Sequence, residues 1–233
     1  MPEELEILYR TDYLVAINKP HGLLVHPTRI ALDADTSVLQ ILRAQLEQKV
    51  YPVHRLDRKT SGVLLMALNK ETQSILNALF ANRKIDKIYT AIVRGFIPDQ
   101  GVIDYAIKND KGVLKDALTH YEVIERYEID EPFGKFSTSR YSEVRLIPKT
   151  GRYHQLRMHM AHIFHPIIGD RPHGCNKQNR LFKERFSMMT MMLHAEQISF
   201  TLNNESITIE GKHSREYSRV KKLLTKRDIQ SGT

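Results

Sequence analysis

The segment that most constrains the fold is an uninterrupted apolar run at residues 63–68, Val-Leu-Leu-Met-Ala-Leu, which follows Gly62. A short apolar run without polar alternation predicts a strand that is buried on both faces. Such a strand needs covering layers, and amphipathic helix patterns with capping residues stand on either side of it. One pattern follows Thr36 or Ser37 and carries Val38, Leu39, Leu42 and Leu46; the other follows Asn69 and carries Ile75, Leu76, Leu79 and Phe80.

The rest of the chain is rich in β-forming residues, especially after residue 85. Strands are predicted at 14–17, 88–93, 117–129, 139–147, 191–202 and 206–209, with Asn203-Asn204 joining the last two in a hairpin. Helices are predicted at 154–164, before Pro166, and at about 214–225. Because neighbouring strand patterns follow one another, we expect an α+β fold with a mixed, largely antiparallel central sheet flanked by helices. No linker or repeat interrupts the pattern, so residues 1–233 are expected to form a single domain.

Composition favours an acidic partner and an intracellular location. Lys and Arg number 35 against 27 Asp and Glu, giving a net charge of +8, as in proteins that bind nucleic acids. The single cysteine, Cys175, excludes an internal disulfide and a multi-cysteine zinc site. The acidic N-terminus lacks the pattern of a signal peptide, and no apolar run reaches the ~18 residues that a bilayer requires. We therefore expect a cytoplasmic protein without a membrane partner.

Asp57 stands out as a candidate catalytic carboxylate in the segment 54–62, His-Arg-Leu-Asp-Arg-Lys-Thr-Ser-Gly. The surrounding cations would keep it ionised, as a nucleophile or a base requires. The alternative is a solvated loop in which Asp57 caps a turn or pairs with Arg58. Ser61 lacks the glycine-flanked turn of serine hydrolases, so a turn-forming role is the better interpretation.

A second polar cluster runs from Thr150 to His159 and enters the predicted helix at 154–164. Arg157 could offer its planar guanidinium to a carboxylate or a phosphate, or the helix could be an exposed basic surface. His159, His162 and His165 recur at spacing three and could bind zinc with Asp170 as the acidic ligand. No His-Glu-x-x-His pattern is present, so histidines with hydrogen-bonded or phosphate partners are the preferred interpretation, and no metal is predicted. Tyr89, within a strand pattern, has no local sign of catalysis.

Four sequence blocks, in order over about residues 15–200, resemble the RluA-type pseudouridine synthases. The first two blocks are Asn18-Lys19-Pro20-His21-Gly22 with Val25-His26-Pro27, and His54-Arg55-Leu56-Asp57 with Thr60-Ser61-Gly62, Ala67 and Lys70. The others are Lys87-Ile88-Tyr89 with Val93 and Gly95, and Thr150-Gly151-Arg152, His154-Gln155-Leu156-Arg157, His159, Pro166-Ile167 and Gly169-Asp170. The resemblance implies the pseudouridine synthase fold and the isomerisation of uridine in RNA without metal or cofactor.

The resemblance also implies roles for individual residues. Asp57 matches the catalytic aspartate, Tyr89 the tyrosine that packs on the target base, and Arg157 the arginine that pairs with the aspartate. Arg55 matches the residue that replaces the extruded uridine, and the neighbouring His54 is also expected to bind substrate. Leu193 is expected to form an apolar wall of the pocket. Asp57 could act at C1′ or as a base, and the sequence leaves both routes open.

The target RNA is inferred from finer features. The synthase motifs begin by residue 17, so we expect no N-terminal S4 RNA-binding domain. The segments 169–174, 177–180 and 192–195 resemble the member of the family that modifies uridine 65 in the acceptor stem of tRNA. Alternatives are a dual-specificity enzyme for ribosomal and transfer RNA, a non-catalytic RNA-binding module of the same fold, and a metal-dependent hydrolase. We expect a monomer with no obligatory protein partner.

Overall fold

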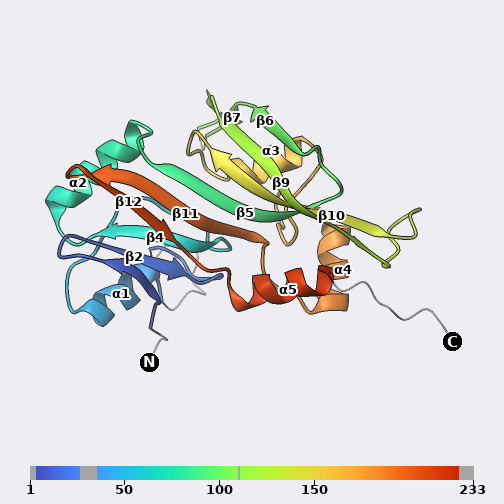
Figure 1. Cartoon of the computed structure of the whole chain (residues 1–233), viewed down its shortest axis with the longest axis horizontal. Coiled ribbons are helices and arrows are strands. Elements are labelled where there is room, and N and C mark those ends of the chain that lie inside the picture. The colour runs from blue at the N-terminus through green and yellow to red at the C-terminus, as the bar shows by residue number, and fades with distance from the viewer. Residues whose placement is uncertain (1–3, 27–35, 110, 226–233) are drawn as a thin grey trace. The chain divides into compact units, whose positions relative to one another are not determined.

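The structure, a computed structural model, describes residues 4–26, 36–109 and 111–225 (Figure 1). The chain divides into two compact units, the first made of residues 1–89 and 194–214 and the second of residues 90–193 and 215–233. The strand β5 (Asp86–Arg94) carries the chain from the first unit into the second. Among the described helices, none combines the length and the apolar character that a membrane span requires.

The first unit is built on a mixed sheet in the order β1-β2-β4-β11. Its strands are β1 (Ile7–Arg10), β2 (Leu14–Lys19), β3 (Tyr51–Pro52), β4 (Ser61–Ala67), β11 (Leu193–Leu202) and β12 (Glu205–Glu210). β4 and β11 run parallel, whereas the pairs β1–β2, β2–β4, β3–β4 and β11–β12 are antiparallel. Every residue of β4 is buried, which confirms the strand predicted from the apolar run.

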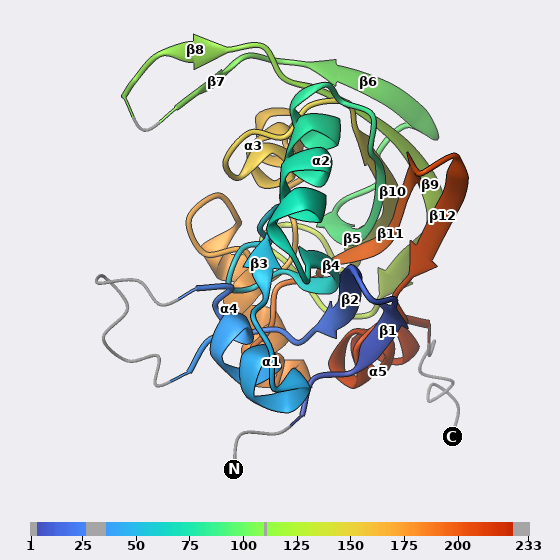
Figure 2. The same cartoon turned by 90° about the vertical axis from the view of Figure 1, so that its left-hand side faces the viewer.

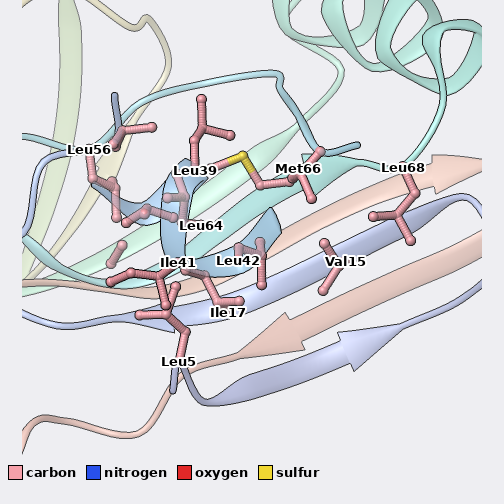
Figure 3. Close-up of a cluster of buried hydrophobic side chains, with 14 residues drawn as sticks. Leu5, Val15, Ile17, Leu39, Ile41, Leu42, Leu56, Leu64, Met66 and Leu68 are labelled. Carbon is pink, nitrogen blue, oxygen red and sulfur yellow. The ribbon is translucent and has the colours of Figure 1, made fainter. Parts of the chain in front are cut away.

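Two helices cover opposite faces of this sheet, α1 (Val38–Leu46) and α2 (Lys70–Ala81) (Figure 2). Alternate residues of β4 face each layer: Leu64 and Met66 pack in the α1 cluster shown in Figure 3, and Leu65 packs with α2. This alternation follows from the two-residue period of a strand. The predicted caps are confirmed, because Ser37 forms a capping box and Asn69 accepts a hydrogen bond from the backbone of Thr72 at 2.8 Å.

The second unit contains a sheet with the strand order β5-β10-β9-β6, in which β9 pairs antiparallel with both β10 and β6. Its further strands are β6 (Gln100–Asp104), β7 (Ile107–Lys108), β8 (Leu114–Lys115), β9 (Leu118–Ile129) and β10 (Ser139–Pro148). Its helices are α3 (Gln155–His162), α4 (Asn176–Phe186) and α5 (Arg215–Thr225). The core under this sheet joins Ile92 and Tyr141 to Phe182 of α4 and Val220 of α5.

The α+β class with a mixed, largely antiparallel sheet is confirmed, and the differences lie at helix ends and in short elements. The helix predicted at 154–164 is shorter because His154 and Phe164, at its two ends, have φ angles of 53° and 65°. Helix α4 was not predicted, since only Gln178 and Phe182 of its residues are buried. The hairpin turn is confirmed at Asn203-Asn204, whose φ angles of 51° and 64° are those that such turns require.

Candidate functional site

Backbone hydrogen bonds hold the loop that carries Asp57 against the loop after β2. Gly22 and Arg58 bond twice: the Gly22 amide donates to the Arg58 carbonyl at 2.8 Å, and Arg58 Nε donates to the Gly22 carbonyl at 3.0 Å. Gly22 has a φ of +89°, which favours glycine because other side chains would be strained there. The first two sequence blocks therefore form one local structure; Pro27 of the first block lies outside the described residues.

Lys19 is the buried cation of this structure. Its side chain has no exposed surface, and its Nζ donates to the carbonyls of Pro20 at 2.9 Å and Arg58 at 3.2 Å. Burial lowers the pKa of Lys19 from 10.5 to about 7, while the charge of Asp57 opposes that shift. Buried lysines respond strongly to such desolvation, so the charge that Lys19 presents to Asp57 depends on pH near neutrality.

Asp57 and Tyr89 are electrostatic neighbours in the first unit. Asp57 is partly exposed and opens a tight turn in which the Thr60 amide donates to its carbonyl at 3.1 Å. Tyr89 packs against the α1 cluster. Burial, and then the charge of Asp57, raise the pKa of the Tyr89 phenol. Tyr89 therefore stays protonated at physiological pH and can act as a hydrogen-bond donor.

His54 has structural contacts that its sequence pattern did not reveal. Its Nε2 accepts a hydrogen bond from the Leu65 amide at 2.9 Å, and its ring stacks on Phe80 with the centroids 4.8 Å apart. Burial, and then the charge of Lys87, lower the pKa of His54 to about 3. The imidazole is consequently neutral, with its proton on Nδ1, and it fixes the start of the loop that carries Asp57 to β4.

Arg55 is exposed, in contrast to its neighbours His54 and Leu56. Its charge adds to partial burial in lowering the pKa of His26. Arg55 therefore places an exposed guanidinium two positions before the candidate carboxylate.

Ser61 serves the sheet and is not placed as a nucleophile. It is 5% exposed, and its hydroxyl lies 2.9 Å from Nδ1 of His194. His194 Nε2 carries the ring proton and donates it to the Gly211 carbonyl at 3.0 Å, so Nδ1 accepts the hydrogen bond from the Ser61 hydroxyl. The next residue, Gly62, has a φ of +109°, and a Cβ atom there would lie 2.1 Å from the carbonyl oxygen of Ala195. Glycine at this position therefore allows β4 to approach β11.

Arg157, in the second unit, is held by a buried partner. Its Nε and Nη2 donate to the two carboxylate oxygens of Asp170, each at 2.8 Å, and the two side chains are 6% and 1% exposed. The backbone of Asp170 is fixed in turn, because Asn179 donates to its carbonyl at 2.6 Å. The sequence interpretation considered Asp170 only as a possible metal ligand. The signal it missed is that a buried arginine requires an anion, and Asp170 stands in the same sequence block.

His159 in α3 and His165 after it form hydrogen bonds within the protein. Both ring nitrogens of His159 lie 3.0 Å from oxygen atoms, the Thr119 hydroxyl and the Tyr105 carbonyl, and His165 Nδ1 lies 2.8 Å from the Arg94 carbonyl. Among the described residues, no three His, Cys, Asp or Glu side chains are grouped to hold a metal ion. Satisfied histidines, the preferred interpretation of the sequence, therefore describe His159 and His165.

The candidate site residues are divided between the two units. Asp57, Tyr89, Arg55 and His54 belong to the first unit, where Asp57 and Tyr89 interact through charge. Arg157 and Leu193 belong to the second, where Leu193, at the start of β11, is 3% exposed. The electrostatic role of Lys19 is the main feature that sequence analysis missed, although its Asn-Lys-Pro motif had marked the position.

Comparison with known proteins identifies the family of the chain. Residues 13–162 match the sequence model of a family described as RNA pseudouridylate synthase. A Vibrio parahaemolyticus protein named tRNA pseudouridine synthase C is 44% identical over 90% of this chain and 91% of its own length. A Haemophilus ducreyi protein of the same name is 46% identical over 85% and 86%. Human RNA pseudouridylate synthase domain containing 4 has a similar structure, with a TM-score of 0.74, 26% identity, and 94% of this chain and 92% of that chain covered.

Proposed function

Since the chain belongs to the RNA pseudouridylate synthase family, we propose that this RNA pseudouridine synthase acts on tRNA, with Asp57 as its catalytic carboxylate. The observation that carries the substrate is the level of identity, 41–46% over most of the chain, to relatives named tRNA pseudouridine synthase C. The position of Asp57, partly exposed on a hydrogen-bonded turn near a buried lysine and a protonated tyrosine, supports its role.

The reaction is an isomerisation within one nucleotide. The bond between C1′ and N1 breaks, the uracil turns, C5 bonds to C1′, and the proton on C5 is lost to water while N1 gains one. Asp57 would either attack C1′ or remove a proton from the sugar to release the base. Both routes need an ionised carboxylate, and the neighbouring Lys19 favours that form when it carries its proton.

Tyr89 and Arg157 complete the proposed catalytic set. As a protonated phenol, Tyr89 can stack on the target base and direct a hydrogen bond toward it. The two bonds to Asp170 fix the plane of the Arg157 guanidinium, which suits a residue that must present its charge in one orientation.

Substrate binding requires that the target uridine leaves the RNA stack, at a cost of a few kcal/mol. We propose that the exposed Arg55 fills the gap and that Leu193 supplies an apolar wall for the extruded base. His54 would support substrate binding by holding the Arg55–Asp57 loop on β4. Uridine 65 of the acceptor stem is the proposed target, a dual-specificity enzyme is the alternative, and we propose a cytoplasmic monomer.

The experiment that tests the carboxylate measures tritium release to water from tRNA labelled at C5 of uracil. Asp57→Asn should abolish release, whereas the matched change at the exposed Asp12, Asp12→Asn, should leave it unchanged. Equal activity of Asp57→Asn and the parent would refute the role. Activity that survives chelation would eliminate the hydrolase alternative, and no release from any cellular tRNA or rRNA would favour a binding module.

The target is tested by mapping pseudouridine in total RNA from cells that lack the protein. Loss at tRNA position 65 alone supports the proposal, and concurrent loss in ribosomal RNA supports the dual-specificity alternative. Arg55→Ala should slow turnover on folded RNA more than it weakens binding, because its proposed role is in flipping; equal losses would contradict that role.

A further inference from the structure

A pocket lined entirely by residues of the second unit has no part in the chemistry proposed above. It lies where the tip of the β9–β10 hairpin meets the end of β5 and helix α4, and its volume is about 560 Å³. In Figure 1 the hairpin tip projects on the right, beside α4. The residues that give the pocket its chemistry are Arg94, Phe133, Lys135, Phe136, Arg140 and Gln178.

Gln178 places a buried polar amide in the wall of this pocket. Its side chain is 2% exposed, and its Oε1 accepts a hydrogen bond from the Tyr141 hydroxyl at 2.6 Å. Its amide nitrogen has no hydrogen-bond partner in the described part of the chain, and no buried polar side-chain atom there is left unsatisfied. That nitrogen therefore keeps access to solvent through the pocket, and it can donate to a ligand carbonyl or phosphate oxygen.

Two phenylalanines form the hairpin tip. Reciprocal backbone hydrogen bonds of 2.9 and 3.2 Å join Phe133 and Phe136, and Gly134 between them has a φ of +63°. Phe136 is 62% exposed although it is a large aromatic side chain. An exposed ring held on a short hairpin offers a flat face for stacking, which core packing does not explain.

Three cations, Arg94, Lys135 and Arg140, line the same pocket as these rings. Within residues 4–26, 36–109 and 111–225, Arg94 and Lys135 have no ion-pair partner, and the Lys135 ammonium lies 5.5 Å from the centre of the Phe136 ring. Arg140 lies over the Phe96 ring at 5.1 Å and is paired through Nε with Glu128 at 3.0 Å. The uncompensated positive charge of Arg94 and Lys135 suits an anion beside the aromatic face.

A stacking face, an amide donor and two unpaired cations together match a nucleotide. We propose that this pocket holds one unpaired nucleotide of the RNA substrate, its base on Phe136 and its phosphate at Arg94 and Lys135. The inference rests on the proposed function, because it treats the RNA that is modified as the ligand. The pocket then contributes to affinity and to the choice of RNA, and leaves the chemical step at Asp57 unchanged.

Kinetics with unmodified tRNA transcript test the stacking. Phe136→Leu, which keeps an apolar side chain without a ring, should raise KM about 5- to 30-fold while kcat stays within about twofold. Phe136→Tyr, which keeps the ring, should resemble the parent. Equal KM values for parent and Phe136→Leu, with normal turnover, would overturn the stacking. If instead the parent fails to modify any RNA, the proposed function fails.

The salt dependence of binding tests the phosphate contact. Arg94→Gln should reduce the slope of log Kd against log salt by about one, since one phosphate contact is lost. Gln178 and Phe136 carry no charge, so Phe136→Leu should leave that slope unchanged. An unchanged slope in Arg94→Gln would overturn the phosphate assignment.

A fluorescence measurement reports on the pocket directly, because the chain contains no tryptophan. In an Asp57→Asn background, Phe136→Trp should be quenched when tRNA is added, because a base stacks on the indole. Val102→Trp, at an exposed position of β6 outside the pocket, serves as the control and should change little. Binding of tRNA without quenching of Phe136→Trp, or equal quenching of both reporters, would overturn the proposal.

Discussion

Breaking the buried ion pair between Arg157 and Asp170 should strongly destabilise the protein. The pair is bidentate, with both bonds at 2.8 Å and the side chains only 6% and 1% exposed. Removing one partner of such a pair weakens the compensation of the buried charge and costs about 3–5 kcal/mol. The cost of Asp170→Asn in unfolding free energy should lie near the lower end of this range, about 3 kcal/mol, because the amide oxygen can still accept one hydrogen bond. That is a large fraction of the about 5–15 kcal/mol that stabilises a typical domain.

Urea unfolding followed by far-ultraviolet circular dichroism measures the loss of free energy. In thermal unfolding we expect a drop in Tm of about 6–12 °C. The matched control is Asp99→Asn, which breaks the ion pair with Arg126, where Asp99 is 85% exposed. That change should cost less than about 1 kcal/mol. A loss below about 1 kcal/mol for Asp170→Asn would refute the view that Asp170 neutralises Arg157. The variant should also lose activity through a lower kcat, because the guanidinium is no longer held in one plane.

Three further predictions concern the pH dependence of stability, a close backbone approach and cooperativity. Between about pH 7 and 10.5 Lys19 is protonated in the unfolded chain and deprotonated in the folded chain, so this group makes the unfolding free energy rise with pH. In urea titrations at several pH values, Lys19→Met should flatten that rise. His54 and His194, with folded pKa values of about 3 and about 4, act in the same direction at lower pH and should cause stability to fall as the pH drops below about 6.5. NMR titration should find neither ring protonated at pH 6. Gly62→Ala should lower the unfolding free energy by more than about 3 kcal/mol or prevent folding. Gly112→Ala, also at positive φ but with open space around it, should lower it by about 1 kcal/mol. Similar losses for the two variants would contradict the role of the 2.1 Å approach to Ala195. Finally, we predict that the chain unfolds as a single domain, and two resolved calorimetric transitions would show that its two compact units are independent.

Local patterns determined the parts of the fold that obey local rules. The apolar run at 63–68 predicted β4, the caps Ser37 and Asn69 marked the starts of α1 and α2, and Asn203-Asn204 marked a hairpin. In each case the physical cause acts within a few residues, through strand alternation, a cap or a turn conformation. Helix α4 was missed because its burial rests on Gln178 and Phe182, too few positions to produce a helical period.

The family blocks marked Asp57, Tyr89 and Arg157 by order and spacing, but only the tertiary structure revealed their partners. Lys19 stands in the first family block, but its lowered pKa arises because folding buries it and brings it near Asp57, 38 positions later (57 − 19). The pairing of Asp170 with Arg157 and the exposure of the Phe136 ring likewise follow from the positions that folding gives these residues. Desolvation and charge pairing depend on which groups share a site in space, and the sequence of a chain does not contain those distances.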